Sequence, residues 1–195
     1  MSADKPDIAV GRIPVVNDAQ AKVVVDKIVA YNTNHNAGDW QNTIFFMGDD
    51  GNENLHMQDV EDAATMIEGL NPAYHIKKVM WDAFNRVNSA QGATYPDVSK
   101  IIKQQQAQGA LIMDYVGHGV EYQISHENVL RLSDFTSFNN KNLPLWITAS
   151  CDIMPFDGTV ANIGESALLN PNGGAVAFFG TTRTVYANYI KRINM

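Results

Sequence analysis

Two residues of this chain could do nucleophilic chemistry, and both follow apolar runs. His118 stands between Gly117 and Gly119 after the run ALIMDYV, and Cys151, the chain's single cysteine, ends the run LPLWITAS. A thiolate can attack a carbonyl carbon while an imidazole holds the proton that later goes to the leaving amine. The pair therefore predicts acyl transfer through a covalent intermediate, provided that the fold brings the two side chains together.

The residues around this pair favour the same chemistry. Gly117 and Gly119 would leave room beside the imidazole for a substrate backbone. The backbone amides of Gly119 and Cys151 could face the oxyanion that forms during attack. The plainer interpretation is a loop histidine with ordinary hydrogen bonds and a small buried cysteine. The position of both residues at the ends of apolar runs favours the chemical interpretation.

An acidic pair, Asp49 and Asp50, ends a third apolar run, NTIFFMG. A carboxylate here could orient His118 or bind a metal, but GDDGNEN is also good turn chemistry and acidic residues suit a helix start. Calcium stays unsupported, because DDGNE lacks the ligand spacing of an EF-hand loop. His56 follows the turn closely enough to line a pocket. The other histidines, interpreted as surface residues in polar segments, are His35, His75 and His126.

The elements that must position these residues form an α/β pattern. Apolar runs ended by turn residues alternate with amphipathic stretches, which predicts a mostly parallel sheet flanked by helices, a three-layer αβα sandwich. The predicted strands are DIAVGRIPV, NTIFFMGDDG, YHIKKVMW at an edge, ALIMDYVGHG, LPLWITASC and GGAVAFFGTT; SHENVLRLSDFTSFNN is expected to be a helix plus loop. The carboxyl ends of parallel strands share one edge of a sheet, which is where ligands bind.

Composition sets further limits. The chain has 195 residues and a formal charge of −7. It has no cluster of basic residues that would neutralise nucleic-acid phosphates. No apolar run reaches the length of a membrane span, and the N-terminus lacks the order of a secretory signal. We expect residues 1–195 to form a single domain that is a fragment of a longer protein.

The order of the motifs DIAVGRIPV, NTIFFMGDDG, GALIMDYVGHG, LPLWITASCD and GESALLNPNGGAVAFFGTTR resembles the gingipain-type cysteine peptidases, peptidase family C25. The resemblance is greatest to the PorU branch, the signal peptidase and sortase of the type IX secretion system. It implies a caspase-like fold, Cys151 and His118 as the catalytic dyad, and the amides of Gly119 and Cys151 as the oxyanion hole. It also implies Asp50, or its neighbour Asp49, as the acidic residue near the histidine.

The resemblance further implies a pocket for the substrate side chain, formed by Thr181, Thr182 and Tyr186 in the loop GTTRTVY and by His56. Arginine-specific members have an acidic residue where this chain has NENLHM, so trypsin-like specificity is not expected. Implied substrates are secreted proteins with C-terminal sorting domains, together with other secretion components as partners, at the cell envelope, outer membrane or cell surface. Neither a cofactor nor a metal is implied.

Two other classes of function compete with this hypothesis. A phosphoreceiver domain is also a small parallel α/β unit with paired aspartates, but it needs an aspartate and a lysine where this chain has YVGHG and GTT. The second alternative is a non-catalytic binding scaffold with a peptidase-like fold. The presence of both His118 and Cys151 argues against it.

Overall fold

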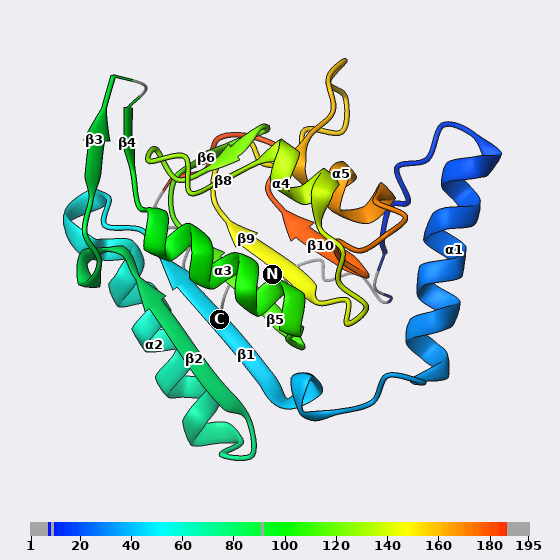
Figure 1. Ribbon diagram of the computed structural model, residues 1–195, viewed down its shortest axis with the longest axis horizontal. Coiled ribbons are helices and arrows are strands. Elements are labelled where there is room, and N and C mark those ends of the chain that lie inside the picture. Colours follow the sequence, from blue (N-terminus) through cyan, green and yellow to red (C-terminus); the bar gives the residue numbers. More distant parts are fainter. Residues whose placement is uncertain (1–7, 9, 91, 187–195) are drawn as a thin grey trace, which may run out of the picture.

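The computed structural model describes residues 8, 10–90 and 92–186. Its centre is a parallel sheet of five strands in the order β10-β9-β5-β1-β2 (Figure 1). These strands are β1 (Thr43–Gly48), β2 (His75–Met80), β5 (Ile112–Val116), β9 (Leu145–Ala149) and β10 (Ala177–Gly180). All four pairings between neighbouring strands are parallel, which confirms the predicted fold class. The edge position predicted for YHIKKVMW is also correct, because β2 ends the strand order and, within the described part of the chain, pairs only with β1.

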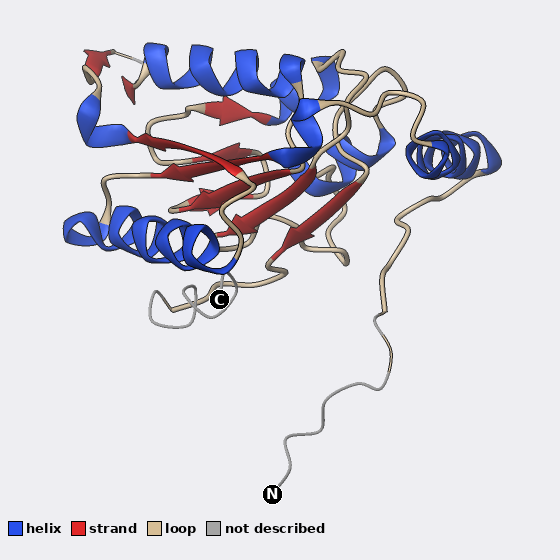
Figure 2. Ribbon diagram, turned by 90° about the horizontal axis from the view of Figure 1, so that it is seen from below, coloured by secondary structure: helices blue, strands red, loops and turns tan. Residues whose placement is uncertain are grey.

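Helices cover both faces of the sheet (Figure 2). One face carries α2 (Leu55–Leu70), and the other carries α3 (Pro96–Gln108), α4 (Leu132–Ser137) and α5 (Ile163–Leu169). Helix α1 (Asp18–Thr33) lies to the side, against α5. The short 3-10 helices are η1 (Asp39–Asn42), η2 (Asn52–Asn54) and η3 (Trp81–Ala83). None of the helices described combines the length and apolar character needed to cross a bilayer.

Alternation along β1 divides the core between these two layers. Phe45 and Met47 pack into the cluster that includes α3, whereas Ile44 and Phe46 pack against α2. Because β1 is buried on both faces, its sequence is a continuous apolar run rather than an alternating one. Burial of each such side chain contributes about 1.5 to 3 kcal/mol. This buried strand, paired on both sides with β2 and β5, fixes the position of the residues that follow it.

Two expected elements differ from the structure. Residues 10–15 belong to no strand, and the start of SHENVLRLSDFTSFNN, expected to be helical, forms turns and strand β8 (Leu130–Arg131) before α4 begins. Strand β8 completes a small sheet with β6 (Gly119–Val120) and β7 (Gln123–Ile124), which precede this segment. Strands β3 (Val87–Ser89) and β4 (Gly92–Thr94) form a separate antiparallel pair. Ser125 and Asn128 have φ values of 64° and 52°, which a right-handed helix cannot accommodate.

The strand order creates a switch point beside β1. The chain passes from β1 to β2 on one side and then returns to place β5 on the other side. In doubly wound sheets, ligands bind at the carboxyl ends of the strands where the order reverses. The residues after β1, β5 and β9 meet at that edge, and they include the acidic pair, His118 and Cys151.

Candidate active site

Asp49 lies directly after β1 and is only 1% exposed. Its backbone N–H donates to the carbonyl of Val116 at 3.2 Å, which extends the pairing of β1 with β5 by one residue. Its Oδ1 accepts a hydrogen bond from the amide of Gly51 at 3.1 Å, and its Oδ2 accepts one from the amide of His118 at 2.7 Å. These backbone donors hold a buried carboxylate in one orientation.

His118 follows β5 and faces Asp49 with one ring nitrogen. Its Nδ1 lies 3.3 Å from Asp49 Oδ2, so the Nδ1–H donates to the carboxylate and Nε2 is left to exchange protons. The carbonyl of His118 accepts hydrogen bonds from the Ser125 amide at 2.8 Å and from the Tyr115 hydroxyl at 2.7 Å. Its side chain is 27% exposed. The imidazole is therefore fixed at its backbone and at Nδ1 but still reaches solvent.

The charges at this pair support each other. The hydrogen bond to Asp49 raises the pKa of His118 above its ordinary value, against the opposing effect of desolvation. Burial alone would raise the pKa of Asp49, but hydrogen bonds from His118 and His56 hold it well below the usual range. The Tyr115 hydroxyl, 3.0 Å from Asp49 Oδ2, has a raised pKa because of burial and the nearby carboxylate. Asp49 is thus ionised wherever His118 titrates.

Three glycines fit closely around these side chains. A Cβ on Gly51 would overlap the His118 ring, 2.6 Å from Nδ1, and a Cβ on Gly117 would lie 2.5 Å from Asp49 Oδ2. A Cβ on Gly119 would lie 2.5 Å from Ile153 Cδ1. The space at Gly117 and Gly119 is therefore filled by protein, which corrects our expectation that these glycines leave room for a substrate.

Cys151 lies two residues after β9 and is partly exposed. Its thiol donates to the carbonyl of Val185 at 3.3 Å, and its Sγ accepts from the Val185 amide at 3.4 Å. Within the part of the chain that the structure describes, the thiol makes no hydrogen bond with His118. Catalytic hydrogen bonds are often long or poorly aligned before substrate binds, and they tighten in the complex.

The two amides predicted for the oxyanion hole are available. Gly119 lies opposite Ile124 in the β6–β7 hairpin. The hydrogen bond of the hairpin here runs between the next residues along, from the Ser125 amide to the His118 carbonyl. Gly119 and Ile124 are therefore a pair without direct hydrogen bonds, and the Gly119 amide does not donate to Ile124. The amide of Cys151 has no acceptor among the described residues, whereas the next amide, of Asp152, donates to Arg183. Stabilisation of an oxyanion requires free amides of this kind next to the attacking group, and here they would lie next to the thiol.

Asp50 and His56 occupy places that differ from those expected. The carboxylate of Asp50 accepts a hydrogen bond from the Tyr95 hydroxyl at 2.7 Å, and Asp49 is the residue that contacts His118. The imidazole of His56 is 1% exposed and bonds to Asp49 and Asn52, so it lines no open pocket. Strand β1 ends so that the first acidic side chain, not the second, is directed toward His118.

The loop predicted to line the substrate pocket runs beside Cys151. The Thr181 hydroxyl donates to the carbonyl of Ser150, and the Thr181 carbonyl accepts from Met154 at 2.9 Å. Thr182 is partly buried, and Tyr186 is 80% exposed. The position of this loop is compatible with a pocket, and contact of Thr181, Thr182 and Tyr186 with a substrate stays a prediction.

Two neighbours of His118 were not identified from the sequence. Tyr115 reaches both Asp49 and the His118 carbonyl, and the His126 ring lies against that of His118 with 4.1 Å between centroids. The position of Tyr115 offered a signal, since it lies near the end of β5, three residues before His118. His126 carries no such signal, because the turns after β7 bring it back over the site.

Asp49, His56 and His118 are the described residues best placed to hold a metal ion, with one ligand atom from each within 4.8 Å of the others. However, the amides of Gly51 and His118 already point at the carboxylate oxygens. These N–H dipoles favour a bare carboxylate over a cation in the same place. The donor set fits an orienting carboxylate better than a metal centre.

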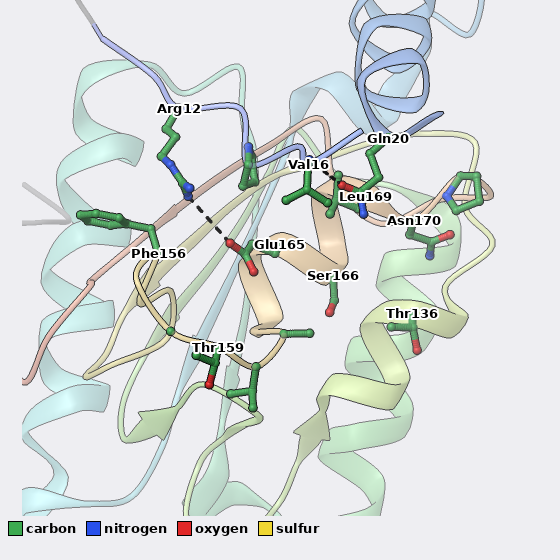
Figure 3. A pocket seen from close by; sticks show the side chains of 15 residues that line it. Arg12, Val16, Gln20, Thr136, Phe156, Thr159, Glu165, Ser166, Leu169 and Asn170 are labelled. Atoms are coloured by element: carbon green, nitrogen blue, oxygen red, sulfur yellow. Dashed lines mark hydrogen bonds and ion pairs between the residues drawn. The ribbon is translucent and has the colours of Figure 1, made fainter. Parts of the chain in front are cut away.

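A pocket lies away from Cys151 and His118. It has a volume of about 500 Å³ and lies between the segment before α1, helix α5 and the loop after Cys151 (Figure 3). Arg12 approaches Glu165 there at 3.8 Å and lies over the ring of Phe156. Neither Cys151 nor His118 lines this pocket, so we assign it no role in the chemistry of that pair.

Comparisons with known proteins identify the family and the fold. Residues 2–195 match the family model described as Peptidase family C25. The structure resembles that of the Arg-specific cysteine proteinase gingipain R, with a TM-score of 0.72 and 16% identity over 93% of this chain and 41% of that chain. It also resembles the complex of Porphyromonas gingivalis RgpB pro- and mature domains, with a TM-score of 0.73 and 15% identity over 95% and 43% of the two chains.

An uncharacterised protein of Archaeoglobus fulgidus is 22% identical over 209 residues, which cover 95% of this chain and 49% of that protein. The chain therefore spans about half the length of this curated relative and about two fifths of the solved ones. At these identities the solved structures establish the fold, while the family model establishes the relationship.

Proposed function

Because the chain belongs to peptidase family C25, we propose that it is a cysteine peptidase domain in which Cys151 is the nucleophile and His118 is the general base and acid. Asp49 orients the imidazole. The observation that carries this proposal is the contact between the buried Asp49 carboxylate and His118 Nδ1, which leaves Nε2 for proton transfer at the edge of the sheet where Cys151 lies.

The chemistry follows from these positions. Nε2 of His118 takes the thiol proton, and Sγ of Cys151 bonds to the carbonyl carbon of the substrate. The amides of Gly119 and Cys151 receive the oxyanion. When the C–N bond breaks, the imidazolium gives its proton to the leaving amine, which leaves a thioester. Water then attacks the thioester, His118 takes the proton of that water, and the acid and the free thiol are released.

Before this can occur, the thiol must leave Val185. Sγ is held by the backbone of Val185, not by the imidazole. A rotation about the Cα–Cβ bond of Cys151 changes only one dihedral angle, and staggered side-chain positions are closely spaced in energy. A substrate backbone that binds beside the 181–186 loop would compete for the same Val185 groups and release the thiol.

The test is selective modification of Cys151. The wild-type chain should form a covalent adduct with a peptidyl electrophile, detected by intact mass, and His118→Ala should slow this reaction by about tenfold or more. His35→Ala is the matched control, because His35 is exposed and far along the chain from the site. Equal labelling rates for the wild type and His118→Ala would leave the peptidase fold as a non-catalytic scaffold.

The finer proposal concerns the substrate. Resemblance of the motifs to the PorU branch suggests secreted proteins with C-terminal sorting domains, which would be cut at the cell envelope, outer membrane or cell surface. Transfer of the acyl group to an amine would differ from hydrolysis only in the nucleophile that reaches the thioester. Incubation of the protein with a sorting-domain substrate, followed by mass measurement of the products, reports the cleavage position and any transfer. Intact substrate after incubation with protein that labels normally would refute this substrate class.

A further inference from the structure

We propose that His56 is a positioning residue for this reaction, holding Asp49 in the orientation that aligns His118. The inference rests on the proposed function and adds a residue that does not touch the substrate. Its starting point is geometric: His56 Nδ1 hydrogen-bonds Asp49 Oδ1, while His118 Nδ1 faces the other oxygen, Oδ2. One carboxylate therefore joins two imidazoles.

The hydrogen bonds of His56 define which ring nitrogen carries its proton. The side-chain amide nitrogen of Asn52 lies 3.1 Å from His56 Nε2 and is a donor, so Nε2 must accept. The proton then lies on Nδ1, which donates to Asp49. Asn52 thus selects the histidine tautomer that the carboxylate needs, in the way that a second partner sets the tautomer of a catalytic or metal-bound histidine.

Local backbone structure supports a positioning role. Asn52, Glu53 and Asn54 have φ values of 52°, 55° and 68°, three successive residues in the left-handed region. Asparagine tolerates this conformation, but glutamate does not favour it. The turn brings His56, in the first turn of α2, back toward the end of β1. Strain of this kind persists where the surrounding contacts determine it.

Burial separates His56 and Asp49 from the solvated part of the site. The side chains of His56 and Asp49 are each 2% exposed, compared with 27% for His118. His56 therefore cannot reach a substrate, and it acts through Asp49. The other groups that face this carboxylate are the Tyr115 hydroxyl and the amides of Gly51 and His118. Among the described residues, His56 is the one that holds Oδ1 from the side of α2.

The experiment uses a matched pair of substitutions in the 195-residue chain. His56→Asn keeps a donor nitrogen near the position of Nδ1, whereas His56→Leu removes it. The rate of Cys151 alkylation by iodoacetamide should fall by about tenfold in His56→Leu and by less than about threefold in His56→Asn. Melting temperatures measured in parallel show whether both variants fold. Equal rates in both variants, whether unchanged or reduced, would overturn the proposal.

A second readout does not depend on activity. Histidine-selective nitrogen NMR should show His56 with a proton on Nδ1 and none on Nε2, and His56→Leu should shift the His118 Nδ1 resonance. A proton on Nε2 of His56 would overturn the inference. If His118→Ala is alkylated as fast as the wild type, the proposed function fails. The His118 resonance in the two His56 variants then still decides whether His56 positions Asp49 and His118.

Discussion

Replacing each of the two neighbouring aspartates with asparagine, one at a time, tests the assignment of the site most directly. In Asp49→Asn the carboxylate that faces His118 is lost, while in Asp50→Asn the carboxylate bound to Tyr95 is lost. The substitutions are chemically identical and one residue apart. Only the first should impair the reactivity of Cys151.

The expected magnitude follows from the distance. At an effective dielectric constant of about 20, unit charges 3.3 Å apart interact by about 5 kcal/mol, which is an upper limit for the support that Asp49 gives to a His118 imidazolium. Desolvation of the carboxylate opposes this interaction, and the asparagine dipole retains part of it. We expect a net loss of about 3 kcal/mol, which corresponds to a rate about 100-fold lower. Asp50→Asn loses one partly exposed hydrogen bond and should change the rate by about twofold.

The assay is the second-order rate of Cys151 alkylation as a function of pH, with adducts counted by intact mass. Titration of the His118 Cε1 proton by NMR gives the pKa of the same residue independently. In Asp49→Asn this pKa should fall toward its ordinary value, because the hydrogen bond to the carboxylate is what raises it. A larger effect from Asp50→Asn than from Asp49→Asn in either measurement would refute the assignment.

Three further predictions concern other contacts. Gly51→Ala should reduce the rate of Cys151 alkylation by about tenfold or more, because its Cβ would overlap the His118 ring. The control, Gly69→Ala in α2, places its Cβ in open space and should stabilise the fold by about 0.5 to 1 kcal/mol in urea unfolding. Lys27→Met should destabilise the fold by about 1.5 to 3 kcal/mol in the same measurement, because the ammonium donates to carbonyls around the end of α5. Folding lowers the pKa of Asp49 below 3.8, so the stability that its carboxylate contributes is present above about pH 3.8 and is lost as the pH falls toward the folded pKa. The free energy of unfolding of Asp49→Asn should therefore fall less than that of the wild type over this acid range.

The strands could be predicted because burial on both faces leaves a simple signal. The runs that became β1, β5 and β9 are mostly apolar, with Asp114 as the one charged residue inside them, and the acidic pair, His118 and Cys151 follow their ends. Parallel order then places the three ends on one edge. Expectations from the sequence were weakest where the chain leaves the sheet, since the hairpins after His118 depend on residues with positive φ that periodicity does not detect.

The choice between Asp49 and Asp50 could not be made from the sequence, because it depends on where β1 stops pairing with β5. A shift of one residue turns every side chain of a strand to the opposite face. The hydrogen bond from Asp49 N to Val116 O continues the strand register and selects the first aspartate. His126 was assigned to the surface from its polar segment, and it is exposed, but polarity does not report the turns that bring its ring against His118. His56 was placed near the site from its position after the acidic turn, which does not report that its ring is buried against Asp49 and His118.

The site therefore divides into a fixed part and a movable part. Asp49 is held by the amides of Gly51 and His118, by His56 and by Tyr115, and His118 is held at its carbonyl and at Nδ1. Cys151 is attached to none of these groups, and its thiol is held by the backbone of Val185 instead. Groups whose orientation is fixed before the reaction require no reorganisation during it. In the proposed dyad the imidazole is thus held before substrate binds, and the thiol is the group that we expect to move, away from the 181–186 loop that holds it.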